Sequence, residues 1–172
     1  MSTTATVIVY DQNGYHAAAA RDPTTEIVSS SENLIESLNN KEYECLSVGI
    51  CSRNKSRIID NILGLSKVTS IWLCEYPEHG GPEEDPLHHP KVKEIFFNSG
   101  ENDLHNLEFE GHMYNSEYCQ RKECRVQEDF ENAALIRINE EWLENIPKSY
   151  QPEESHKASS AEEVQTSTET QN

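Results

Sequence analysis

The fold is decided by the stretch Cys45-Leu46-Ser47-Val48-Gly49-Ile50-Cys51, a seven-residue run that is apolar apart from one serine. Its length predicts a strand, and its continuous apolar character is typical of a strand buried on both faces of a parallel sheet. Two more runs of this kind lie at residues 6–11 and 69–75, and a fourth strand is predicted at 92–97. We therefore expect an open parallel sheet of about four strands.

Helical patterns separate the first three of these strands. Leu34 and Leu38 recur at helical spacing after Ser29 and Glu32, which have the spacing of a capping box, and a second apolar stripe lies at residues 58–63. Alternating strands and helices predict right-handed crossovers that place helices on both faces of the sheet. We expect strand 6–11 to be central, between strands 45–51 and 69–75, and strand 92–97 to lie at an edge.

The sequence after residue 100 is predicted to be helical and then disordered. Leu104 and Leu107 begin a helical pattern that Gly111 weakens, and a firmer helix runs from about Gln127 to Asn145. One face of that helix is expected to carry Phe130, Ala133, Ala134, Ile138, Trp142 and Leu143. The predicted organisation is a receiver-like α/β core at 1–98, a helical extension packed on it at 99–147, and a disordered acidic tail rich in Ser, Thr and Glu at 148–172.

Charge and the amino terminus limit the possible partners. The 172 residues include 31 acidic and 14 basic side chains, a formal net charge of −17, which repels nucleic-acid phosphates and anionic lipid headgroups. Residues 1–6 contain no basic residue, the following apolar run is short, and no stretch approaches the roughly 18 apolar residues of a membrane span. We expect a cytoplasmic protein with a protein partner, no nucleic acid and no membrane, whose five cysteines are reduced core thiols.

The strand at 45–51 leads into the one cluster of positive charge in the chain, Cys51-Ser52-Arg53-Asn54-Lys55-Ser56-Arg57. This spacing resembles the phosphate-binding loop of cysteine-dependent phosphatases, and the resemblance implies a nucleophilic Cys51 and an Arg57 that clamps the phosphoryl oxygens. The chain departs from the family pattern, because Ile50 replaces the usual histidine, Ile58 replaces a hydroxyl residue, and the loop has no glycine. An anion-binding loop and a solvated crossover loop remain alternative interpretations.

Ligands of open α/β sheets bind outside the carboxyl ends of the strands. The candidate ligand-binding residues at those ends are Asp11, Ser52, Arg53, Asn54, Lys55, Ser56 and Glu75. No glycine-rich fingerprint follows a strand, so we predict no cofactor. We also predict no metal site, because the loop at 79–89 mixes histidine and carboxylate groups without a standard ligand set, and Cys119 and Cys124 lack the spacing of structural zinc.

Two resemblances concern the sheet as a whole. Asp11 stands where signalling receiver domains carry an acidic pocket, but Glu75 occupies the phosphoacceptor position and Phe97-Asn98 replaces the usual lysine, which implies a receiver-like shape without phosphotransfer. The blocks at 45–50, 58–62 and 68–74 resemble an uncharacterised receiver-like α/β module of rotifer proteins, often found ahead of ADP-ribosyltransferase or tetratricopeptide-repeat regions. The likeness covers roughly residues 5–100 and implies an accessory or regulatory domain.

The functional expectation follows from the absence of a convergent catalytic set in the sequence. We expect a non-enzymatic protein-interaction or regulatory α/β module. Two alternatives stay open. One is a phosphatase-like or phosphate-binding domain that uses Cys51 and Arg57, and the other is small-ligand binding at the carboxyl ends of the strands.

Overall fold

The computed structural model describes residues 3–52, 55–75, 89–97 and 102–145. Along these residues the elements are β1 (Val7–Tyr10), β2 (Thr25–Val28), α1 (Ser31–Asn39), β3 (Leu46–Ile50), α2 (Lys55–Ile62), β4 (Val68–Glu75), β5 (Val92–Phe96), α3 (Asp103–Arg121) and α4 (Arg125–Asn145). The tail predicted to be disordered at 148–172, and most of the candidate metal loop at 79–89, lie outside the described residues.

The sheet has five parallel strands in the order β2-β1-β3-β4-β5. The predicted open parallel α/β sheet is thus confirmed, and its strand order is that of the flavodoxin-like doubly wound class. The last strand is a parallel edge strand, as expected. The expected pairing of strand 6–11 with strand 69–75 is wrong, because β4 pairs with β3 through Ile50 and Leu73. The other side of β1 is occupied by β2, which the sequence patterns did not predict.

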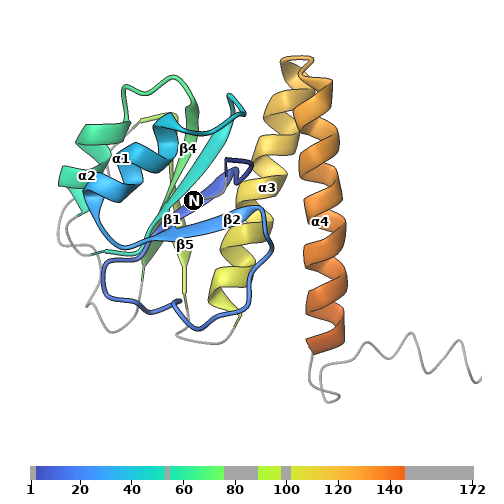
Figure 1. Ribbon diagram of the computed structural model, residues 1–172, viewed down its shortest axis with the longest axis horizontal. Coiled ribbons are helices and arrows are strands. Elements are labelled where there is room, and N and C mark those ends of the chain that lie inside the picture. Colours follow the sequence, from blue (N-terminus) through green and yellow to red (C-terminus); the bar gives the residue numbers. More distant parts are fainter. Residues whose placement is uncertain (1–2, 53–54, 76–88, 98–101, 146–172) are drawn as a thin grey trace, which may run out of the picture. The chain divides into compact units, whose positions relative to one another are not determined.

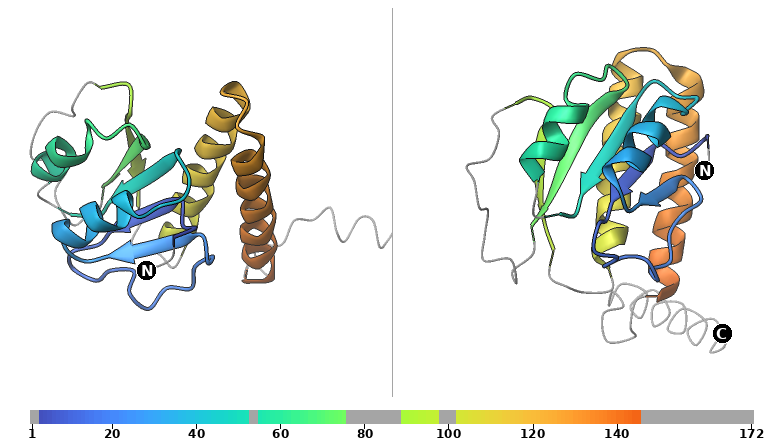
Figure 2. Two further views of the ribbon diagram at one scale, coloured as in Figure 1. Left: turned by 45° about the horizontal axis from the view of Figure 1, so that its top comes forward. Right: turned by 60° about the vertical axis from the view of Figure 1, so that its left-hand side comes forward.

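Helices cover both faces of the sheet, as predicted (Figure 1). Ile8 and Tyr10 of β1 belong to the apolar cluster that α1 and α2 close, whereas Val7 and Val9 belong to the cluster that α3 closes on the opposite face. Figure 2 shows α1 and α2 together on one side of the strands and α3 on the other. Burial on both faces explains why the central strands are apolar at consecutive positions.

Local sequence features explain where two of the helices begin and how closely they approach the sheet. Ser30 is the N-cap of α1, and its Oγ accepts a hydrogen bond of 3.1 Å from the amide of Asn33, one residue later than the capping box predicted from Ser29. In α3, a Cβ built on Gly111 would lie 2.9 Å from Cγ2 of Val7. The glycine that weakens the helical pattern is therefore the residue that lets α3 approach β1 closely.

The predicted helix at 127–145 is confirmed as α4, although its buried side differs from the prediction. Ala134 and Ile138 are buried, but Ala133 and Leu143 are exposed. The side chain of Trp142 lies outside the described residues. Met1–Asn139 form one compact unit and Glu140–Asn172 a second, and every tertiary contact discussed below lies within the first. Among the described helices, none combines the length and the apolar character needed to cross a bilayer.

Candidate functional site at the carboxyl edge of the sheet

Several of the predicted site residues lie at the carboxyl edge, the side of the sheet where β1, β3 and β4 end. Asp11 follows β1, Cys51 and Ser52 follow β3, Glu75 ends β4, and Lys55 begins α2. Ser56 and Arg57 lie in the first turn of α2, half-buried and exposed respectively. Arg53 and Asn54 lie outside the described residues.

The carboxylate of Asp11 orders its own loop. Its Oδ1 accepts a hydrogen bond of 3.0 Å from the amide of Tyr15, and its Oδ2 accepts one of 2.7 Å from the amide of His16. Gly14 has a φ of 73°, a conformation that costs glycine little, and it closes the turn. Asp11 is itself buried, so this carboxylate serves the 11–16 loop rather than facing solvent as a ligand group.

The neighbouring polar residues also have partners within the protein. Lys55 Nζ lies 2.9 Å from Oε1 of Glu75, an ion pair of two largely buried side chains that joins α2 to the end of β4. Ser52 Oγ donates a hydrogen bond of 3.1 Å to Oε1 of Gln12. The candidate ligand-binding groups of the three strand ends are thus engaged in contacts that stabilise the edge itself.

Cys51 is fully buried at this edge, and His16 lies against it. The imidazole ring is hydrogen-bonded to the Cys51 thiol and packs edge-on against Phe97, with ring centroids 5.6 Å apart. Sequence reasoning did not select His16, because a lone histidine in a loop carries no motif. Only the 11–16 turn, which Asp11 organises, brings it to the thiol.

The electrostatic surroundings of His16 favour its charged form. Burial alone would lower the pKa of this imidazole, but the Cys51 thiol and the carboxylates of Asp11 and Asp103 outweigh burial and raise it. Asp103 reaches this edge from the first turn of α3. The edge therefore holds a protonatable histidine between a thiol and two acidic side chains.

The phosphatase-like arrangement of Cys51 and Arg57 is not favoured by these positions. The thiol is covered by the His16 and Phe97 contacts and has no exposed surface, while Arg57 points from α2 toward solvent. A phosphate-binding nucleophile and its arginine clamp must both reach the same ligand. In the described part of the chain, no contact joins these two side chains.

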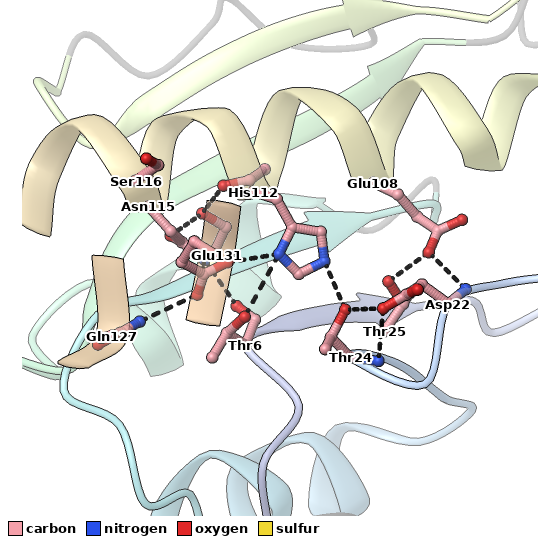
Figure 3. A network of polar contacts seen from close by, with 12 residues as sticks. Thr6, Asp22, Thr24, Thr25, Glu108, His112, Asn115, Ser116, Gln127 and Glu131 are labelled. Carbon is pink, nitrogen blue, oxygen red and sulfur yellow. Dashed lines mark hydrogen bonds and ion pairs between the residues drawn. The ribbon is translucent and has the colours of Figure 1, made fainter. Parts of the chain in front are cut away.

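A second polar cluster, which the sequence analysis missed, lies between the sheet and the α3–α4 hairpin. We call it the polar layer; it comprises Thr6, Asp22, Thr24, Thr25, Cys45, Ser47, Ser70, Glu108, His112, Asn115, Gln127 and Glu131. Figure 3 labels residues of this region that come from the segment just before β1, the segment that leads into β2, α3 and α4. Among the described residues, no buried side-chain nitrogen or oxygen lacks a hydrogen-bond partner.

His112 is the centre of the polar layer and is completely buried. Its Nδ1 lies 2.5 Å from Oε2 of Glu131, and its Nε2 lies 3.0 Å from Oγ1 of Thr24, whose hydroxyl donates to Oδ2 of Asp22 (Figure 3). These three contacts need three hydrogens, and Thr24 supplies one. Because the Thr24 hydroxyl donates to Asp22, Nε2 of His112 donates to Oγ1 of Thr24, and Nδ1 shares a hydrogen with the Glu131 carboxyl group.

Asp22 and Glu108 hold the outer end of the same layer. Burial would raise the pKa of Asp22, but hydrogen bonds from Arg137 and Thr24 outweigh it and the pKa is lowered. Glu108 Oε2 accepts hydrogen bonds from the Asp22 amide and the Thr25 hydroxyl, yet burial dominates and raises the pKa of Glu108. The fold thus stabilises the anionic form of Asp22 and disfavours the anionic form of Glu108.

The polar layer and the carboxyl edge differ in what they can do chemically. The layer is closed, since its members satisfy one another, and it joins α4 to α3 and the sheet. Within the described ranges, no group of three His, Cys, Asp or Glu side chains is placed to hold a metal ion, and Cys119 is buried whereas Cys124 is exposed. No known protein family, curated protein or solved structure matched this chain.

Proposed function

We propose that this chain is a non-enzymatic protein-interaction module whose contact surface is the outer side of α4. The observation that carries the proposal is that α4 buries two polar side chains and exposes two large apolar ones. Its buried side includes Gln127 and Glu131, which are 5% and 0% exposed, while its outer side includes Val126 and Ile136, which are 77% and 60% exposed. A surface helix ordinarily buries its apolar side and exposes its polar side.

Three exposed apolar residues, Val126, Ala133 and Ile136, form a stripe along one side of α4, and the exposed Asp129 lies among them. Val126 and Ile136 are ten residues apart, which places them about 80° apart around the helix and about 15 Å apart along it. Ala133, also exposed, lies between them in angle and leaves room for a neighbouring backbone. A stripe of this length and width fits the apolar side of one amphipathic helix, so we propose a partner protein that supplies such a helix.

The partner is expected to be a protein for electrostatic reasons as well. A formal net charge of −17 disfavours phosphate-rich partners over the whole surface, and this argument applies to nucleic acids and anionic membranes alike. Apolar contact at α4 does not depend on that charge. The polar residues of the carboxyl edge support the same conclusion, because Asp11, Ser52, Lys55 and Glu75 all have partners within the fold.

A site-specific photo-crosslinker tests this proposal. In one variant a photoreactive residue replaces Ala133, which lies between Val126 and Ile136. In a second variant of the same chain it replaces Asp60, which is exposed on α2. We expect partner adducts at position 133 that disappear in the double variant V126S/I136S. The matched control is Phe96→Ser, since Phe96 is 73% exposed on β5 and its loss should leave the adducts unchanged.

Three outcomes would contradict the proposal. Adducts at position 133 that survive V126S/I136S, or that are no more frequent than at position 60, would show that the stripe is not the contact surface. Adducts between two copies of the purified chain would show that the stripe mediates self-association rather than binding of a different protein. Circular dichroism of each variant ensures that a lost adduct reflects the surface and not unfolding.

A further inference from the structure

Two buried thiols lie side by side at the carboxyl edge. Ile50 of β3 and Leu73 of β4 are register partners, so the next pair in the parallel ladder is Cys51 and Cys74. Both cysteines belong to the apolar cluster under α3, which puts their side chains on the same face of the sheet. Neighbouring strands lie about 4.8 Å apart, within the range of about 4.4–6.8 Å between the Cα atoms of a disulfide.

The two thiols are in direct contact and have unequal surroundings. Cys74 is hydrogen-bonded to Cys51, and burial holds the pKa of Cys74 well above its ordinary value, although Lys55 nearby acts in the opposite direction. Cys51 is in addition hydrogen-bonded to His16, whose ring is flanked by Asp11 and Asp103. A protonated imidazole in contact with a thiol stabilises the thiolate, which is the reactive form.

A second thiol pair in the same chain lacks this feature and provides an internal comparison. Cys45 and Cys119 are also buried and hydrogen-bonded to each other, but the other partners of Cys45 are Thr69 and Asn115. Burial raises the pKa of Cys119 to about 11 and raises the pKa of Cys45 further. This pair therefore remains protonated at neutral pH.

We propose that Cys51 and Cys74 are a peroxide-oxidised dithiol site, with Cys51 as the attacking thiol, Cys74 as the resolving thiol and His16 as a positioning residue. The Cys51 thiolate attacks one oxygen of hydrogen peroxide, the O–O bond breaks, and a sulfenic acid and hydroxide form. The Cys74 thiol then attacks the Cys51 sulfur and the S–O bond breaks. The sum is two thiols and one peroxide giving one disulfide and two waters.

Access to the site is controlled by the 11–16 loop. His16 and Phe97 cover Cys51, and the loop is held in place by the hydrogen bonds of Asp11 to the amides of Tyr15 and His16. Oxidation therefore requires a transient opening of this loop, and we expect reaction with millimolar peroxide over minutes rather than seconds. Bridging the ends of β3 and β4 is reversible by a dithiol reductant.

The experiment uses the full chain with Cys124→Ser, because Cys124 is exposed and would form mixed products. Hydrogen peroxide is added at pH 7, free thiols are blocked with iodoacetamide after denaturation, and peptides are identified by mass spectrometry. We expect a linked Cys51–Cys74 peptide, with Cys45 and Cys119 reduced at the time when most of the first pair is linked. Cys74→Ala should leave Cys51 as a trappable sulfenic acid.

The role of His16 needs a readout that simple packing would not affect. In His16→Gln we expect the rate of Cys51–Cys74 disulfide formation to fall about tenfold at pH 7. The rate should recover as the pH rises to the pKa of an ordinary free thiol. Equal oxidation of the Cys45–Cys119 pair, or no linked peptide in a protein that circular dichroism shows to be folded, would overturn the proposal. A His16→Gln rate with an unchanged pH profile would overturn the role of His16.

Discussion

The sharpest test of the polar layer is a pair of substitutions at Glu108, which should change stability in opposite directions. Both hydrogen bonds that anchor this carboxylate end on Oε2, at 2.9 Å from the Asp22 amide and 2.6 Å from Oγ1 of Thr25. Among the described residues, no hydrogen bond ends on Oε1. A glutamine can therefore place its carbonyl oxygen at the Oε2 position, keep both donors satisfied and turn its amide group toward the Oε1 position.

Glu108→Gln should stabilise the protein at neutral pH. Burial raises the pKa of Glu108 above the ordinary 4.5, so the folded state binds this proton more tightly than the unfolded state, and the free energy of unfolding falls as the pH rises from about 4.5 through the raised value. Glutamine removes this loss. We expect a gain of roughly 0.5–1.5 kcal/mol at pH 7, equivalent to a rise of a few degrees in the thermal midpoint, and no gain at pH 4.

Glu108→Ala is the matched control, because it removes the charge and the acceptor together. The Asp22 amide and the Thr25 hydroxyl then lose their partner in a buried site, at a cost of about 2–4 kcal/mol for the two donors. Urea unfolding of the three proteins, followed by circular dichroism between pH 4 and pH 8, measures both effects. A glutamine variant that is less stable than the parent at pH 7 and equally so at pH 4 would refute the reasoning.

Two further predictions concern the same face of the sheet. Asp22→Asn should cost about 1 kcal/mol at neutral pH, a modest value because the Arg137 partner is about half exposed. Arg137 and Thr24 lower the pKa of Asp22 against the effect of burial, so this contribution to stability is present above about pH 3.8 and is lost in stronger acid. The difference in urea midpoint between the two proteins should therefore shrink in acid. Gly49→Ala should cost about 1–3 kcal/mol, because its Cβ would lie 2.5 Å from Cδ2 of Leu107 inside the core, whereas Gly64→Ala, with open space around it, should leave the thermal midpoint nearly unchanged.

The strands that bury both faces could be predicted from the sequence, and the edge strand β2 could not. Apolar runs mark β1, β3 and β4 because burial on both faces requires consecutive apolar residues. By contrast, β2 has only four residues, and two of them are Thr25 and Glu26. Glu26 pairs with Lys41 and Ser37, so polar side chains complete this edge. Because β2 was not predicted, its place beside β1 was wrongly given to the strand at 69–75.

The candidate site could be predicted in part. The sequence placed Asp11, Cys51 and Glu75 at the carboxyl ends of strands, and all three lie at one edge of the sheet. It could not identify His16, because the loop geometry that brings the ring to Cys51 depends on hydrogen bonds between Asp11 and backbone amides. Nor does spacing alone reveal that Asp11 and Glu75 are already engaged by their neighbours.

The polar layer corresponds to a pattern in the sequence that can be recognised only when the register of α3 is known. Glu108, His112 and Asn115 follow one another at helical spacing on the same side of α3 as Leu104 and Leu107. A polar residue at such a position predicts an exposed face when it is read alone. This face of α3 is buried because α4 and the starts of the strands supply matching donors and acceptors. Glu131 is hydrogen-bonded to His112 and accepts from Asn115.

The polar layer also explains how α4 can bury polar side chains while large apolar ones stay exposed. Gln127 donates from Nε2 to the Cys45 carbonyl at 2.7 Å and accepts at Oε1 from the Cys45 amide, while Glu131 is held by His112 and Asn115. Sliding α4 by one residue would leave all of these buried groups without partners, at about 1–3 kcal/mol each, whereas an apolar contact would lose far less. Directional bonds thus fix the register of α4 together with the buried Ala134 and Ile138, and Val126 and Ile136 stay exposed. It follows that Val126 and Ile136 are dispensable for folding, so their replacement should change binding at nearly constant stability.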